Sequence, residues 1–193
     1  GGSLGHVIAG YLSAKKNVEV NILTQRPQMW KYELRISTPK GDTLCGKLNV
    51  ISDKPDEALK EVDIVLLCLP GYAIRSELMK IKPYVNSCTY VGSVFSSTGF
   101  FFEAMELLGG DVPLWGFQRV PFIARTNVYG ESAHLLGYKS CHNIAIERCE
   151  DKEGFLPKLK EAFDSCGFDV LIHENIQQLI WDKLFTNVSL SAL

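Results

Sequence analysis

The chain opens with a glycine-rich stretch, Gly1-Gly2-Ser3-Leu4-Gly5-His6, and continues as an apolar, helix-like run over residues 7–14. Gly2 and Gly5 match the second and third glycines of the pattern G-x-G-x-x-G, which follows a strand and opens a helix. There the second glycine lets the backbone approach a pyrophosphate, and the third lets the helix pack on a sheet. We predict that a cofactor phosphate binds at Gly2, Ser3, Leu4 and Gly5. The alternative is an accidental match, because the first glycine and its strand would lie before residue 1.

A strand-like run over residues 18–23 follows and ends at Thr24-Gln25-Arg26. A domain specific for NAD usually places Asp or Glu here to bind the ribose 2′-hydroxyl group. This chain has no acid there, and Arg26 could instead pair with a 2′-phosphate through charge-assisted hydrogen bonds. We therefore favour NADP over NAD as the cofactor, with Thr24 and Arg26 in its site. The alternative for Arg26 is a solvated loop arginine.

The rest of the chain alternates between strand and helix signals. A hairpin is expected at residues 33–36 and 44–51, because Gly41 and Asp42 can supply the positive φ of a tight turn. The run 62–69 is apolar on both alternating faces, which is typical of a central parallel strand. The remaining expected helices are 55–61, 72–84, 101–108 and 154–166, and the remaining strands are 88–94, 114–118, 132–136, 143–146 and 168–172.

This order predicts an α/β fold of the Rossmann type, a doubly wound and mainly parallel sheet. The short strands beyond Gly110 lack crossover helices between them and predict an antiparallel extension of that sheet. We assign residues 1–174 to a dinucleotide-binding Rossmann domain whose first strand is missing. Residues 175–193 have helical periodicity and are assigned to the first helix of a truncated α-helical C-terminal domain for substrate binding or dimerisation.

Two further segments are candidate site residues. Leu69, Pro70 and Gly71 end the apolar run 62–69, and ligands of open α/β sheets bind at the carboxyl ends of strands. A simple strand-to-helix turn is the alternative. Lys183 and Asn187 are four residues apart, so they share one face of the last helix and could converge on a substrate oxygen. A pair that faces solvent is the alternative there.

Composition narrows the class of protein. The 193 residues are 46% hydrophobic with a net charge of −2 and mixed signs, which argues against a nucleic-acid or anionic-membrane partner. The longest apolar run is too short to span a bilayer, and we expect a soluble, cytoplasmic protein. The six cysteines form no C-x-x-C pair, so we expect buried, reduced thiols and no metal site. His6 is expected to cap or pack rather than to catalyse.

Several segments together resemble the N-terminal domain of the octopine/opine dehydrogenases. The most specific is Pro121-Phe122-Ile123-Ala124-Arg125-Thr126, and the resemblance covers nearly the whole chain. The other segments, in the family's order, are 53–58, 62–65, 69–73, 91–93, Gly130 and 136–137. The last helix also looks like that of ketopantoate reductases, whose Trp-x-Lys-Leu-x-x-Asn pattern matches Trp181, Lys183, Leu184 and Asn187.

The resemblance implies an NAD(P)-dependent oxidoreductase that couples an amino acid to a 2-oxo acid, with small-molecule substrates and a possible homodimer. In the opine dehydrogenases the catalytic histidine comes from the C-terminal domain, beyond the segment that matches residues 187–193, so no catalytic histidine is carried over. Lys183 and Asn187, which match the lysine and asparagine that contact the 2-oxo acid in ketopantoate reductases, are the catalytic candidates. Two alternatives stay open. One is a ketopantoate reductase-like enzyme that reduces a 2-oxo acid alone, and the other is a non-catalytic module that senses NADP(H).

Overall fold

A computed structural model describes residues 1–95, 99–138, 141–149, 152–164 and 169–173, together with Gln178, Trp181, Asp182 and Phe185. The chain divides into two compact units. Unit 1 comprises Gly1–Glu61 and Phe122–Lys139, and unit 2 comprises Val62–Pro121 and Ser140–Leu193.

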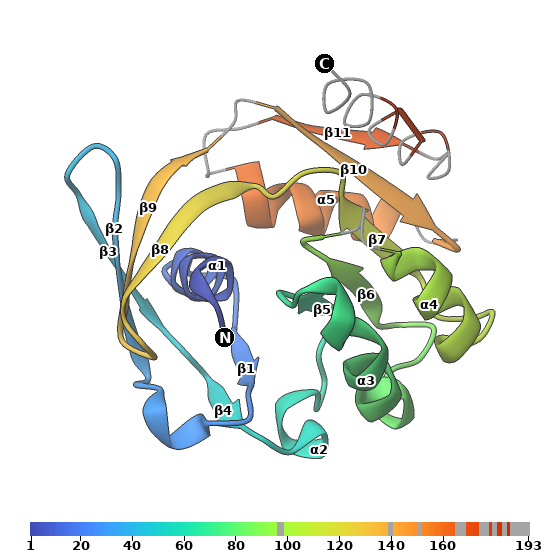
Figure 1. Ribbon diagram of the computed structural model, residues 1–193, viewed down its shortest axis with the longest axis horizontal. Helices are drawn as coiled ribbons and strands as arrows, with labels where there is room; N and C mark the ends of the chain where they lie inside the picture. The colour runs from blue at the N-terminus through green and yellow to red at the C-terminus, as the bar shows by residue number, and fades with distance from the viewer. Residues whose placement is uncertain are drawn as a thin grey trace. The chain divides into compact units, whose positions relative to one another are not determined.

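Unit 1 is built around helix α1 (Ser3–Ser13), which packs on a curved four-stranded sheet of order β3-β2-β9-β8 (Figure 1). Strands β2 and β3 form an antiparallel hairpin, β8 and β9 form another, and β2 joins the two by pairing parallel with β9. Separately, β1 pairs parallel with β4. The bounds are β1 (Asn21–Leu23), η1 (Pro27–Met29), β2 (Glu33–Ser37), β3 (Thr43–Lys47), β4 (Val50–Ser52), α2 (Pro55–Ala58), β8 (Phe122–Val128) and β9 (Ser132–Tyr138).

The predicted hairpin of unit 1 is confirmed, with one correction to its second strand. The run 44–51 divides into two strands, because β3 ends at Lys47 and β4 turns away to pair with β1. Gly41 has the predicted positive φ of 89°, whereas Asp42 does not. The run 132–136 was expected in the extension of the parallel sheet and instead lies in β9 of unit 1, paired with a strand, β8, that the sequence analysis missed.

Unit 2 holds a five-stranded sheet of order β11-β10-β7-β6-β5 (Figure 1). Strands β5, β6 and β7 are parallel, β10 is antiparallel to β7, and β11 is parallel to β10. The bounds are β5 (Ile64–Leu67), α3 (Gly71–Ile81), η2 (Lys82–Tyr84), β6 (Tyr90–Ser93), α4 (Phe100–Leu108), β7 (Leu114–Phe117), β10 (Cys141–Glu147), α5 (Lys152–Asp164) and β11 (Asp169–His173).

The predicted class, parallel sheets with an antiparallel extension, is therefore confirmed, with β10 as the strand that reverses direction. Two details differ. The run 114–118 forms β7, which is parallel to β6, and β5 lies at the end of its sheet among the described strands rather than in the centre. The helix expected beyond residue 174 falls mostly outside the described residues.

The core of unit 2 centres on Trp115 in β7, which is 1% exposed. Its indole Nε1–H donates a hydrogen bond of 3.1 Å to the Tyr90 carbonyl oxygen, and its ring contacts Phe155 and Phe163 of α5 edge-on or tilted. The indole packs against Gly92 in β6, where a Cβ atom would lie 2.3–2.6 Å from three of its ring atoms. The sheet accepts this tryptophan only because residue 92 has no side chain.

Replacing Gly92 by alanine should therefore destabilise the protein by about 1–3 kcal/mol, because a fully buried indole must shift. Gly110→Ala is the matched control, since nothing lies within 4 Å of a Cβ atom there. Thermal and denaturant unfolding of both variants tests this expectation. Equal stability of the two variants would show that Trp115 has room to move.

Candidate functional site

The predicted glycine-rich loop lies at the start of α1 in unit 1. Gly2 is the N-cap in an extended conformation, no side chain caps the helix, and a Cβ atom on Gly2 would meet nothing within 4 Å. The first backbone N–H groups of a helix have no partner inside it and carry the positive end of the helix dipole. This bare start suits an anionic group that approaches the backbone closely.

The side chain of Ser3 contacts Thr126 of β8. Its Oγ accepts a 3.0 Å hydrogen bond from the backbone N–H of Thr126 and lies 3.1 Å from the Thr126 hydroxyl. Leu4 and Gly5 are half-buried in the first turn. Ser3, Leu4 and Gly5 thus offer backbone N–H groups rather than side chains. The sequence analysis missed Thr126, because its pairing with Ser3 spans 123 residues.

His6 anchors the same turn and is fully buried. Its Nε2 accepts a 2.7 Å hydrogen bond from the backbone N–H of Gly130, so that nitrogen carries no proton, and its Nδ1–H donates to the Gly2 carbonyl oxygen at 2.9 Å. The ring stacks on Trp30 with centroids 4.3 Å apart and meets Tyr129 edge-on. His6 therefore packs and positions the loop, in agreement with the structural role expected from the sequence.

Burial lowers the pKa of His6 below its usual 6.5, against a smaller opposing effect of the bond to Gly2. The folded state therefore binds fewer protons than the unfolded state just below pH 6.5, and the stability from neutral His6 is present above that pH and lost as pH falls. We expect the free energy of unfolding to decline less between pH 7 and pH 5 in His6→Gln than in the parent protein. Parallel pH profiles in urea titrations would contradict this.

Thr24 and Arg26 lie just beyond the carboxyl end of β1. Thr24 is buried, its N–H donates to the Ser52 carbonyl oxygen at 2.9 Å, and its hydroxyl receives the Arg26 N–H at 3.4 Å. The Arg26 side chain is exposed, and within the described ranges it has no ion pair. Lys54, at the neighbouring end of β4, instead pairs with Glu57 at 2.8 Å, which also raises its pKa. Of the two basic residues at these strand ends, Arg26 is therefore the one without an ion pair among the described residues.

In unit 2, Leu69, Pro70 and Gly71 join β5 to α3, as the sequence predicts. Pro70 is the N-cap in an extended conformation, and no side chain caps this helix either. Lys183 and Asn187 lie outside the described residues, so their positions stay a prediction.

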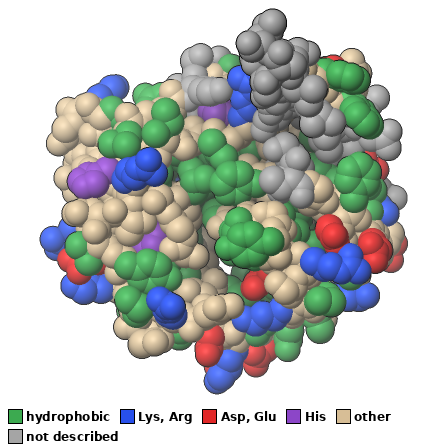
Figure 2. All heavy atoms as spheres, viewed as in Figure 1, with side chains coloured by type: hydrophobic (Ala, Val, Ile, Leu, Met, Phe, Trp, Pro, Cys, Tyr) green, Lys and Arg blue, Asp and Glu red, His purple; other side chains and the backbone are tan. Residues whose placement is uncertain are grey.

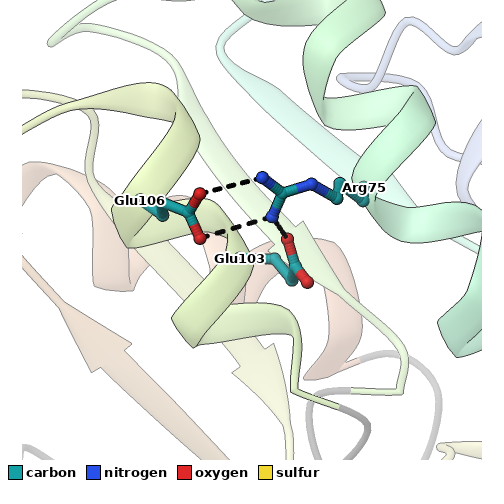
Figure 3. A network of polar contacts seen from close by, with 3 residues as sticks. All are labelled: Arg75, Glu103 and Glu106. Atoms are coloured by element: carbon teal, nitrogen blue, oxygen red, sulfur yellow. Dashed lines mark hydrogen bonds and ion pairs between the residues drawn. The ribbon is translucent and has the colours of Figure 1, made fainter.

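Helix α3 is tied to α4 by one arginine and two glutamates (Figure 3). Arg75 binds both oxygens of Glu106, at 2.8 and 3.3 Å, and also binds Glu103. Both carboxylates raise the pKa of the guanidinium group, with Glu106 the larger cause. The pair of helices is therefore fixed one turn after the Pro70–Gly71 junction.

Among the residues that the structure describes, the other titratable groups give no further site. Acidic and basic side chains lie close to one another on the face seen in Figure 2, as the mixed composition predicts.

The expectation of buried thiols is wrong for Cys45, Cys88 and Cys141, which are free and exposed because their strand and loop positions face solvent. Burial raises the pKa of Cys68 to about 12, so that thiol stays protonated. Within the described ranges, no three His, Cys, Asp or Glu side chains are grouped as metal ligands would be.

Comparison with known proteins finds sequences similar to this chain. Residues 1–95 match the model of the ketopantoate reductase PanE/ApbA family. An opine dehydrogenase from Haliotis discus hannai is 26% identical over 175 residues, which cover 81% of this chain and 43% of the relative. The predicted resemblance to the opine dehydrogenases is confirmed. The chain spans about two-fifths of the length of this relative.

Solved structures show the same fold. An octopine dehydrogenase described with NADH and L-arginine superimposes with a TM-score of 0.84 at 22% identity, over 93% of this chain and 48% of that one. A yersinopine dehydrogenase described with NADP⁺ superimposes with a TM-score of 0.67 at 14% identity, over 90% of this chain and 46% of that one. No helix in the described part of the chain is long and apolar enough to cross a membrane.

Proposed function

We propose that the protein is an NAD(P)-dependent oxidoreductase of the opine dehydrogenase type. It would transfer a hydride between the nicotinamide and a 2-oxo acid or the imine formed from a 2-oxo acid and an amino acid. The observation that carries the proposal is the start of α1, which no side chain caps and which His6 holds to Gly130. It occurs in a chain that resembles dehydrogenases over most of its length.

The residues of unit 1 fit a dinucleotide. Gly2 leaves open the space that a Cβ atom would fill, so a pyrophosphate can approach the N–H groups at the start of α1. Leu69, Pro70 and Gly71 are the cofactor-binding candidates of unit 2. When bound, the nicotinamide supplies the hydride, and the protein supplies binding and orientation.

Arg26 is the residue that favours NADP over NAD in this proposal. Arg26 is exposed at the strand end where a domain specific for NAD usually has Asp or Glu. Among the described residues, no acidic side chain forms an ion pair with it. A guanidinium group binds phosphate in a bidentate manner, whereas it gains little from a ribose hydroxyl.

Arg26→Ala should therefore weaken NADPH binding by about 10- to 100-fold, the equivalent of one lost charge-assisted bond. NADH affinity should change by less than about threefold, because no phosphate is lost from that contact. Isothermal titration of both cofactors measures the effect. Arg35→Ala is the control, since Arg35 pairs with the exposed Glu33. Equal losses for the two cofactors would contradict the NADP assignment.

The substrate side of the proposal rests on residues beyond the described ranges. Lys183 would stabilise the developing negative charge or donate a proton, and Asn187 would orient the substrate. Residues 1–174 would form the cofactor-binding domain, and residues 175–193 would begin a helical substrate or dimerisation domain.

A ketopantoate reductase-like activity is the second candidate, because residues 1–95 match that family's model. Oxidation of NADPH and NADH by the protein, with 2-oxo acids supplied with and without amino acids, separates the candidates. We expect turnover only when both an oxo acid and an amino acid are present. Turnover with an oxo acid alone would favour the reductase, and cofactor binding without any turnover would favour a sensing module.

A further inference from the structure

Tyr72, in the first turn of α3, is exposed in a way that packing does not explain. Its side chain is 90% exposed, more than any other large apolar side chain in the described part of the protein. It follows the Pro70–Gly71 junction directly, at the carboxyl end of β5. Single exposed apolar residues are ordinary on protein surfaces, so the degree of exposure and the place must carry the argument together.

The folding of α3 does not require an aromatic ring at position 72. The helix buries a stripe formed by Ile74, Leu78 and Ile81, which are spaced at helical intervals, and Tyr72 lies outside that stripe. No hydrogen bond of the Tyr72 hydroxyl is found among the described residues. The ring therefore contributes a free aromatic surface where ligands of parallel sheets bind.

The neighbouring ion pairs connect the helix that carries this ring to α4. Arg75 is three residues after Tyr72, so the two lie on the same side of α3, and Arg75 binds Glu103 and Glu106 of α4 (Figure 3). Helix α3 is thus tied to α4 about one turn after Tyr72. The backbone that carries Tyr72 is already ordered in a helix, so little backbone conformational freedom is lost when a ligand binds the ring.

We propose that the Tyr72 ring stacks on a planar ring of the bound nicotinamide dinucleotide. The inference rests on the proposed function and adds to it a residue that recognises the cofactor's aromatic ring rather than its phosphates. Stacking needs the aromatic face and not the hydroxyl group. Phenylalanine should therefore replace tyrosine, whereas a methyl group should not.

Titration of NADH and NADPH into the protein, followed by calorimetry, tests the proposal. Tyr72→Ala should weaken both cofactors by about tenfold, the size of a lost base–aromatic stack, and Tyr72→Phe should stay within about twofold of the parent. Tyr84→Ala is the matched control, because Tyr84 is also exposed and lies in η2 beyond the other end of α3. It should bind as the parent does.

Unchanged cofactor affinity in Tyr72→Ala, with binding intact in the parent, would overturn the stacking role while leaving the proposed function in place. Absence of cofactor binding by the parent protein would overturn both. ADP-ribose identifies the ring involved: a tenfold loss for ADP-ribose as well places Tyr72 against the adenine, and a loss for NADH alone places it against the nicotinamide. A loss in Tyr72→Phe equal to that in Tyr72→Ala would also contradict stacking.

Discussion

The close approach of α1 to strand β3 is the constraint on which unit 1 depends. A side chain at Gly46 would collide with the Gly10 carbonyl oxygen and the Ser13 hydroxyl group, and one at Gly10 would collide with Ile36 of β2. Glycine at both positions lets the helix lie directly on the sheet. The start of the helix is then fixed by His6, whose two ring nitrogens bind the backbone of Gly2 and Gly130. The loop that we assign to the cofactor is therefore held by packing before any ligand arrives.

Local sequence predicted the elements of this fold better than it predicted their partners. The alternation of apolar runs located nearly every helix and strand, and Gly41 marked the β2–β3 turn, because both signals act over a few residues. Strand pairing is decided by contacts distant in the chain. Nothing near Ser132 shows that β9 pairs with β2 almost a hundred residues earlier, so the strand was assigned to the wrong sheet. The run 44–51 was expected to be one strand and forms two, because its second part pairs with β1, a contact that the local sequence does not reveal.

The candidate site shows the same division. Gly2, Arg26 and Pro70 became candidates from motif and position alone, because the strand–loop–helix unit predicts their place. Thr126 and Gly130 could not, since they reach the α1 turn from the β8–β9 hairpin. Whether a basic side chain forms an ion pair is also known only from the structure. Arg26 and Lys54 both follow a strand in the sequence, but only the structure shows that Lys54 pairs with Glu57. The exposure of Tyr72 likewise became visible only when its helix was seen to bury another face.

The central claim, that the start of α1 receives the cofactor pyrophosphate, is tested most directly by placing a side chain at Gly2. The backbone there is extended and the space around it is open, so Gly2→Val should unfold at the same temperature as the parent protein. It should nevertheless bind NADPH and NADH more weakly by more than about tenfold, because the side chain occupies the approach to the helix N–H groups. Gly110→Val is the control. Unchanged affinity of Gly2→Val for both cofactors would contradict the account.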